Sequence, residues 1–201
     1  MSSGAVRANP TNAGVAWTDV RDAAVSAVRR SWPVVPGTCR PDEMGFPELG
    51  PLEHTWDLAP ITDPEQAEET WTRLRQVGVL LVCGHGIDAM EVPFRLYELL
   101  PALGGRGLTV PVVTALAPSR WLLLVATGSG TVRPDLAAAS VCLRGIGQWA
   151  ALPPTTLGGY SPVQWTQAPP EDRDLCLPGA DEVQRVLAEA LNSGRPDDGR
   201  G

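Results

Sequence analysis

Lysine is absent from this chain of 201 residues. Its 16 basic side chains are therefore all arginine, and 23 acidic residues outnumber them, so that the net charge is −7. A protein that binds nucleic acid over most of its surface is expected to be basic. The charge balance thus argues against tight binding driven by phosphate contacts along the whole chain, although it leaves room for a local groove lined by arginine.

Long apolar runs are also missing. The longest, residues 77–83 and 121–126, are far shorter than the ~20 residues that a membrane-spanning helix needs. Residues 1–12 are polar and contain no apolar core of a secretory signal. We therefore expect a soluble, cytoplasmic protein with no membrane partner.

Cysteine and histidine are too scattered for the common metal-binding patterns. The cysteines form no Cys-x-x-Cys pair and are expected to be reduced thiols. Cys39 and His54 share one loop, but a structural zinc site needs four ligands. His85 lies between two glycines, where a turn histidine is expected, and neither this segment nor residues 127–130 continues into the Lys-Ser/Thr pair of a phosphate-binding loop.

The pattern of apolar residues predicts one main domain. Residues 1–17 are expected to form a flexible leader, residues 18–167 the domain, residues 168–193 a linker and a C-terminal helix packed on the domain, and residues 194–201 a disordered tail. Residues 38–62 are rich in proline and glycine and are predicted to form a long irregular loop, a kind of segment that often carries function.

Helix and strand signals alternate within that domain. Helices are predicted to begin at a Thr18 cap, at Asp63-Pro64 with its capping signal, at Pro93 and near residue 181. The β-rich runs at residues 77–83 and 87–92 are expected to pair or to lie side by side. Further strands are predicted at residues 32–35, 110–115, 120–126, 141–144, 148–152 and 162–166. This order indicates an α/β or α+β domain with a mixed β-sheet flanked by helices.

The carboxylates offer little for a metal site. A two-metal centre needs several of them aimed at one point. Asp88 and Glu91 lie three apart in one predicted strand, so a regular strand directs them to opposite faces.

Tryptophan is unusually frequent, with seven residues against two Phe and two Tyr. Trp121 follows Arg120, and Trp149 lies near Arg144. Aromatic rings beside arginine can stack bases, whereas burial in the core is the commoner role for an indole.

Four segments, taken in order, carry a family resemblance. They are RRSWPVVPGT (29–38), ITDPEQAEETW (61–71), VGVLLVCGHGIDAMEV (77–92) and LRGIGQWAALPPTTLGGYSPVQW (143–165). Over residues 19–167 the chain resembles the bifunctional DNA primase/polymerase N-terminal (Prim-Pol) domain of the archaeo-eukaryotic primase superfamily. The resemblance implies a Prim-Pol-like fold and a relation to nucleotidyl transfer in DNA replication.

The same resemblance implies that the catalytic motifs are degenerate. The family's Asp-x-Asp metal pair corresponds here to Glu91 and Pro93, and its Ser-x-His, which contacts the nucleotide, to Ser119 and Trp121. Its third acidic ligand corresponds to Cys142. A single Glu with a thiol is a poor Mg²⁺ site because Mg²⁺ prefers oxygen ligands. A shift of register does not restore the pair, since Asp88 is then followed at the required spacing by a methionine.

We therefore expect a non-catalytic primase/polymerase homologue without a metal cofactor. It would bind a replication-protein partner, or bind single-stranded DNA or nucleotide weakly through Arg120, Trp121 and Arg144 lining one cleft. Both arginines could equally serve only to pair with surface carboxylates. Two alternatives stay open: an active primase/polymerase that holds Mg²⁺ or Mn²⁺ with Asp88 and Glu91, and a protein-interaction module with no nucleic-acid role.

Overall fold

The fold is built around two β-sheets between two groups of helices. The computed structural model describes residues 19–41, 43–44, 47–74, 77–114, 120–156, 163–171 and 176–193. The first sheet has the strand order β2 (Pro47–Pro51), β1 (Val34–Pro41), β3 (Gly78–Val82), β8 (Trp149–Leu152). The second has the order β7 (Cys142–Arg144), β4 (Ile87–Pro93), β6 (Arg120–Ala126), β5 (Val112–Thr114), β9 (Gln164–Gln167).

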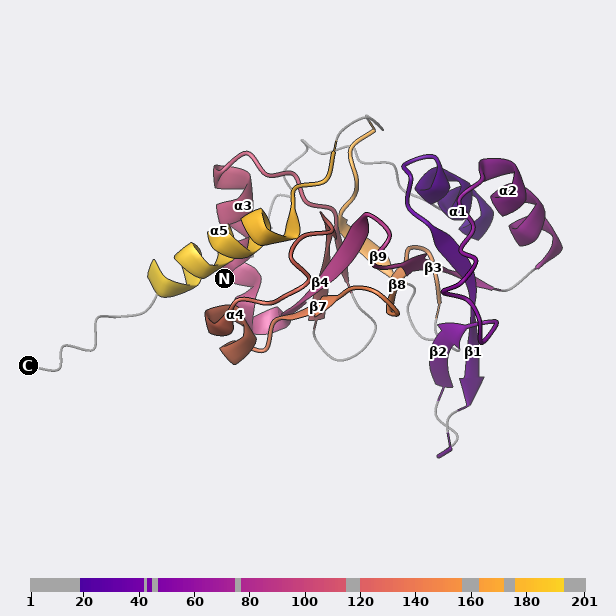
Figure 1. Ribbon diagram of the computed structural model, residues 1–201, viewed down its shortest axis with the longest axis horizontal. Helices are drawn as coiled ribbons and strands as arrows, with labels where there is room; N and C mark the ends of the chain where they lie inside the picture. Colours follow the sequence, from indigo (N-terminus) through magenta and orange to yellow (C-terminus); the bar gives the residue numbers. More distant parts are fainter. Residues whose placement is uncertain are drawn as a thin grey trace, which may run out of the picture.

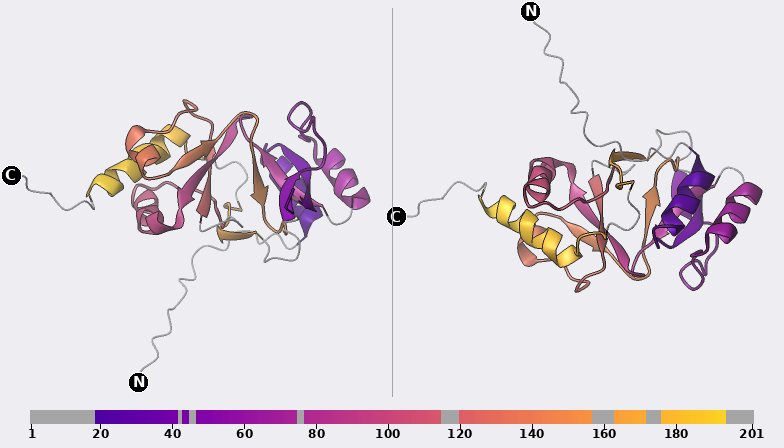
Figure 2. Two further views of the ribbon diagram at one scale, coloured as in Figure 1. Left: turned by 90° about the horizontal axis from the view of Figure 1, so that it is seen from below. Right: turned by 90° about the horizontal axis from the view of Figure 1, so that it is seen from above.

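The helices cover the outer sides of these sheets. Helices α1 (Val20–Val28) and α2 (Pro64–Arg73) lie beside the first sheet, and the 3₁₀ helix η1 (Phe94–Leu99) with α3 (Leu100–Gly105), α4 (Pro134–Ala138) and α5 (Ala180–Ser193) lies beside the second. The two sheets therefore occupy the middle of the molecule (Figures 1 and 2). One buried cluster joins α1, α2 and the first sheet to the inner face of the second, and another fills the space under α3, α4 and α5.

The α+β class is confirmed, but the single mixed sheet was wrong in detail. Every pairing between the named strands is antiparallel. Strands β3 and β4, which the sequence predicts as neighbours, belong to different sheets. Both edges of β3 are occupied by β1 and β8, so the chain passes from Val82 through a glycine turn into the second sheet.

Of the two helix caps that the sequence predicts, one is confirmed and the other is replaced by a neighbouring residue. Asp63 caps α2 as predicted, because its carboxylate accepts a hydrogen bond of 2.8 Å from the backbone N–H of Gln66. At the start of α1 the cap is Asp19 rather than Thr18: the Asp19 carboxylate accepts from the backbone N–H groups of Arg21 and Asp22. Thr18 itself lies outside the described residues, as do the predicted leader and tail.

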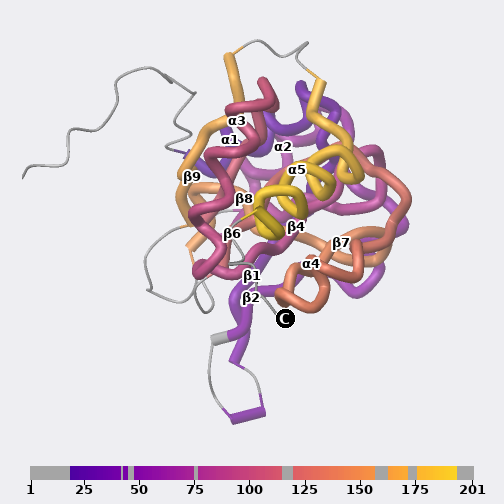
Figure 3. Tube along the Cα trace, turned by 90° about the vertical axis from the view of Figure 1, so that its left-hand side faces the viewer, coloured from indigo at the N-terminus to yellow at the C-terminus, as the bar shows by residue number. Residues whose placement is uncertain are grey.

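The predicted loop over residues 38–62 is partly regular. Strand β1 continues to Pro41 and pairs with β2, for example at Cys39↔Leu49. This β1–β2 hairpin extends away from the rest of the molecule in Figure 3. The sequence did not indicate it because its proline and glycine content hides the alternation typical of strands.

The third predicted helix begins after Pro93 as a 3₁₀ helix, η1, which contains a kink at Leu96, and continues as α3 from Leu100. The short helix α4 was not predicted, although Pro134 occupies its first turn, where proline is favoured. The strands predicted at residues 110–115 and 120–126 correspond to β5 and β6, which pair as neighbours.

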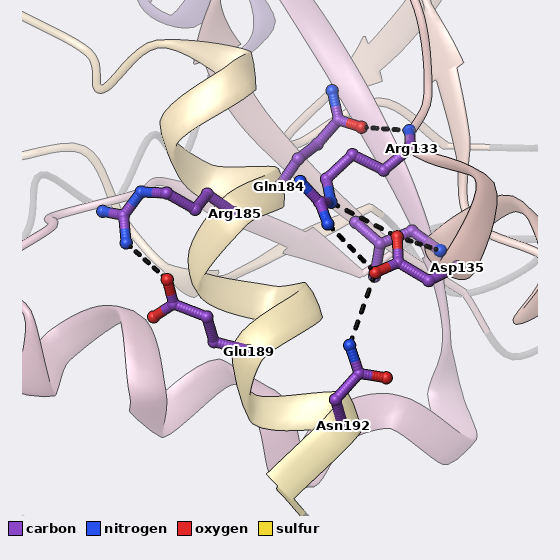
Figure 4. Close-up of polar contacts among 7 residues, drawn as sticks. Arg133, Asp135, Gln184, Arg185, Glu189 and Asn192 are labelled. Carbon is purple, nitrogen blue, oxygen red and sulfur yellow. Dashed lines mark hydrogen bonds and ion pairs between the residues drawn. The ribbon is translucent and has the colours of Figure 1, made fainter.

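Helix α5 is attached to the second sheet's outer side by a buried glutamine. The Gln184 amide donates to the carbonyl oxygen of Thr131 (2.9 Å), and its oxygen accepts from the backbone N–H of Arg133 (2.8 Å). Figure 4 shows the bond between Gln184 and Arg133 beside the Arg133–Asp135 ion pair and the bond from Asn192 to Asp135.

We predict that Gln184→Ala lowers the free energy of unfolding by about 2 kcal/mol, because two backbone groups lose their partners in a buried site. Urea denaturation measures the change. The matched control is Glu182→Ala on the exposed side of α5, which is expected to change stability by less than about 0.5 kcal/mol. Equal stability of the two variants would contradict this account of how α5 docks.

Candidate functional site

The candidate site lies on the inner face of the second sheet, around Glu91. Strand β4 is central, and Glu91 pairs with Leu122 of β6 on one side and with Cys142 of β7 on the other. Residues opposite one another on neighbouring strands point to the same face. That face therefore carries Glu91, Pro93, Arg120, Cys142 and Arg144.

Two arginines hold the Glu91 carboxylate from both sides. The Arg120 Nε lies 3.1 Å from Oε1, and the Arg144 Nε and Nη2 each lie 2.9 Å from Oε2. Oε2 thus accepts a charge-assisted hydrogen bond from Arg144, and Oε1 forms an ion pair with Arg120. We call these three residues the Glu91 clamp.

Each arginine of the clamp is also fixed by a backbone carbonyl. Arg144 Nη1 donates to the carbonyl oxygen of Trp149 (3.0 Å), and its guanidinium lies 6.0 Å from the centroid of the Trp149 ring. Arg120 Nη1 donates to the carbonyl oxygen of Ser140 (2.9 Å). The contact between Arg144 and Trp149 agrees with their closeness in sequence, whereas the two supporting carbonyls and the shared carboxylate had no signal in the sequence.

The clamp is only partly covered. The exposed fractions of the side chains are 18% for Glu91, 28% for Arg120 and 32% for Arg144. One carboxylate opposes two guanidinium groups, so the clamp has one net positive charge that solvent and small anions can approach. Both arginines do pair with a carboxylate, although it is the shared, largely covered Glu91 rather than a fully exposed surface group. That pairing is their only role stays a prediction.

Asp88 does not join this group. It is 1% exposed, and its carboxylate accepts a hydrogen bond of 3.0 Å from the backbone N–H of Gly84. Strand alternation directs it to the face opposite Glu91, as the spacing of the two residues predicts.

The other metal-ligand positions that the resemblance implies also offer few oxygen donors. Pro93 is buried and has no ligating side-chain atom, and the third position is the exposed thiol of Cys142. Ser119 lies outside the described residues. Within the part of the chain that the structure describes, no three His, Cys, Asp or Glu side chains are grouped closely enough to hold a metal ion. The donors present do not fit Mg²⁺.

Trp121 does not line this face with the two arginines, which corrects the expected three-residue cleft. It follows Arg120 in β6, so its side chain points to the outer face, where it is 7% exposed and belongs to the core under α3 and α5. There its ring contacts the rings of Phe94 and Tyr97.

Comparison with family models identifies a match that covers most of the chain. A family model described as "Bifunctional DNA primase/polymerase, N-terminal" (Prim-Pol) matches residues 24–182, which is most of the chain and includes every residue of the Glu91 clamp. No curated protein matches the chain significantly. No helix within the described ranges is both long and apolar enough to cross a membrane.

Two cysteines near the site differ in reactivity. Burial raises the pKa of the Cys83 thiol to about 12, and the nearby Asp88 carboxylate acts in the same direction. The thiolate is the reactive form. Cys83 is therefore protonated at neutral pH, whereas Cys142 is exposed on the inner face.

We predict that iodoacetamide at pH 8 alkylates Cys142 and leaves Cys83 unmodified until the protein unfolds, as measured by peptide mass spectrometry.

The raised pKa of Cys83 also means that the folded form keeps a proton that the unfolded form loses above pH ~8.5. The contribution of Cys83 to stability is therefore complete below that pH and decreases as the pH rises towards 12. Rapid labelling of Cys83 in the native protein would contradict both statements.

Proposed function

The chain belongs to the Prim-Pol family of bifunctional DNA primase/polymerase N-terminal domains, and from this we propose that it is a non-catalytic member that works by binding. Its setting would be DNA replication or the biology of a mobile element. Its ligand would be single-stranded DNA or a nucleotide, held weakly by the Glu91 clamp. No metal cofactor takes part in this function.

The observation that carries this proposal is that the Glu91 carboxylate is paired with two arginines. Phosphoryl transfer by two metal ions needs several carboxylate oxygens directed at one point. Here both oxygens of Glu91 are bonded to Arg120 and Arg144. The guanidinium groups supply the positive charge beside this carboxylate, and neither Pro93 nor Cys142 adds a hard oxygen donor.

The remaining charge of the clamp supports a binding role. Arginine recognises phosphate through paired N–H donors, and a partly exposed cluster with one net positive charge can attract a phosphate group. The attraction is expected to be weak, because Glu91 already takes up several of the donors and the whole chain carries a net charge of −7.

Two other functions would require different features of the protein. An active enzyme that uses Asp88 with Glu91 is disfavoured by their positions on opposite faces of β4. A protein-interaction module with no nucleic-acid role is favoured by the net charge of −7, which repels nucleic acid. The non-catalytic homologue could also bind a replication-protein partner. The experiments below separate these functions.

The substitution Glu91→Gln gives opposite results for a binding protein and for an enzyme. We expect the wild-type protein to incorporate no nucleotide on a primed template with Mg²⁺ or Mn²⁺. Glu91→Gln should bind a single-stranded oligonucleotide several-fold more tightly, with a salt dependence of log K steeper by about 0.7 for one added phosphate contact. Fluorescence anisotropy at several salt concentrations measures both quantities.

The matched control for charge is Glu68→Gln, which removes one negative charge on the exposed side of α2, away from the site. Its binding should stay close to that of the wild type. Templated synthesis by the wild type that Glu91→Gln abolishes would instead establish the active enzyme. Absence of oligonucleotide binding at every salt concentration, in both proteins, would favour the protein-interaction module.

We further predict that Arg144→Gln weakens oligonucleotide binding several-fold and flattens its salt dependence, because the remaining Glu91–Arg120 pair is neutral. Arg73→Gln at the end of α2 serves as the comparison, since it removes the same charge outside the clamp. The clamp is not the binding site if the two variants lose the same affinity.

A further inference from the structure

A group of three aromatic rings lies on the outer face of the second sheet. The centroid of the Trp121 ring is 5.2 Å from that of Phe94 and 5.6 Å from that of Tyr97, and Phe94 and Tyr97 are 6.4 Å apart. Phe94 and Tyr97 belong to η1, and the kink at Leu96 lies between them in the chain. Both rings nevertheless contact the indole of Trp121.

The three rings form a contiguous aromatic group. The plane of Phe94 differs by 21° from that of Tyr97 and by 18° from that of Trp121, whereas Tyr97 is tilted by 37° to the indole. The 6.4 Å separation of Phe94 and Tyr97 is too short for these rings to lie on opposite faces of the indole. We call Phe94 and Tyr97, with Trp121 beneath them, the aromatic platform.

Folding alone does not account for the exposure of this platform. Phe94 is 53% exposed and Tyr97 is 50% exposed, whereas Trp121, which they contact, is 7% exposed. The Nε1–H group of Trp121 is buried and donates to no acceptor in the structure as described. A buried donor without an acceptor is costly, and so is a large apolar surface left in water.

A positive charge lies next to the platform. Arg95, between the two rings in sequence, donates from Nη2 to the carbonyl oxygen of Ala139 (2.8 Å) and pairs with no carboxylate in the described ranges. The next carbonyl, that of Ser140, accepts from Arg120 of the Glu91 clamp. The backbone carbonyl groups of residues 139–140 therefore accept hydrogen bonds from Arg95, beside the platform, and from Arg120, in the clamp. This segment connects the platform to the clamp.

We propose that the aromatic platform is a second nucleic-acid contact, on which bases of a single strand stack while Arg95 contacts the backbone. Base stacking on aromatic side chains beside a cation is the usual means of binding single strands without sequence preference. The strand would pass from the clamp around the edge formed by residues 139–140 to the outer face. This inference deepens the proposed function and rests on it for the class of ligand.

A peptide is the less favoured occupant. A hollow of about 270 Å³ adjoins Tyr97 and is lined mainly by apolar residues of α3 and of residues 108–112, and it could take an apolar side chain. The two exposed rings and Arg95, which pairs with no carboxylate in the described ranges, match a stacked base and a phosphate better, because a base can stack on an exposed ring while its backbone contacts the guanidinium.

The test uses the full chain and a thymidine oligonucleotide. We expect Phe94→Ala and Tyr97→Ala each to weaken binding about tenfold, because each removes one stacking surface. Tyr97→Phe should keep wild-type affinity, and ultraviolet crosslinking of a 5-iodouracil oligonucleotide should attach it to Tyr97 or Phe94. Leu58→Ala is the matched control, since Leu58 is an exposed apolar residue (78%) far from the platform in sequence and in fold.

The outcomes separate this inference from the proposed function. Loss of binding in Arg144→Gln together with unchanged binding in Phe94→Ala and Tyr97→Ala overturns the platform and keeps the clamp. The reverse result supports the platform and overturns the clamp. A wild-type protein that binds no oligonucleotide overturns both. Platform variants that lose binding only to an apolar peptide overturn the platform as a nucleic-acid contact and leave the clamp unaffected. Unchanged thermal unfolding of the alanine variants ensures that a loss of binding is not a loss of fold.

Discussion

The contact between one carboxylate and two guanidinium groups organises the centre of this protein. Glu91 lies in the middle strand of the second sheet, and Arg120 and Arg144 reach it from the strands on either side. A carboxylate that is only 18% exposed needs opposite charge close by, and two arginines provide it. The contact therefore joins β6, β4 and β7 through side chains on the face where the two sheets meet.

The same contact determines what chemistry that face can support. A carboxylate whose oxygens already accept charge-assisted bonds is a poor metal ligand, since an arriving cation must displace both arginines. The face is left with one excess positive charge and with a thiol at Cys142. Such a surface suits a weak interaction with phosphate better than the binding of two divalent cations, which is why we propose a binding function for this member of the Prim-Pol family.

Several features could be read from residue patterns because they depend on local interactions. The Asp63-Pro64 start of α2, the pairing of β5 with β6 and the opposed directions of Asp88 and Glu91 follow from capping, turn spacing and strand alternation. The β1–β2 hairpin and α4 were missed, because proline and glycine hide the strand pattern of the hairpin and α4 is a short helix with little periodicity. The separation of β3 from β4 was missed because strand partners are chosen by contacts between distant segments.

The sequence by itself determined which side chains are available: no Asp-x-Asp pair in any register of residues 87–93, no lysine beside the 16 arginines, and an abundance of tryptophan. Tertiary structure alone decided how that inventory is used. Pairing of β4 with β6 and β7 brings Arg120 and Arg144 onto Glu91, residues that are far apart along the chain. It also sends Trp121 to the opposite face to meet Phe94. The reason is that the face on which a strand residue lies is a local property, whereas its neighbours across the sheet depend on the register of other strands.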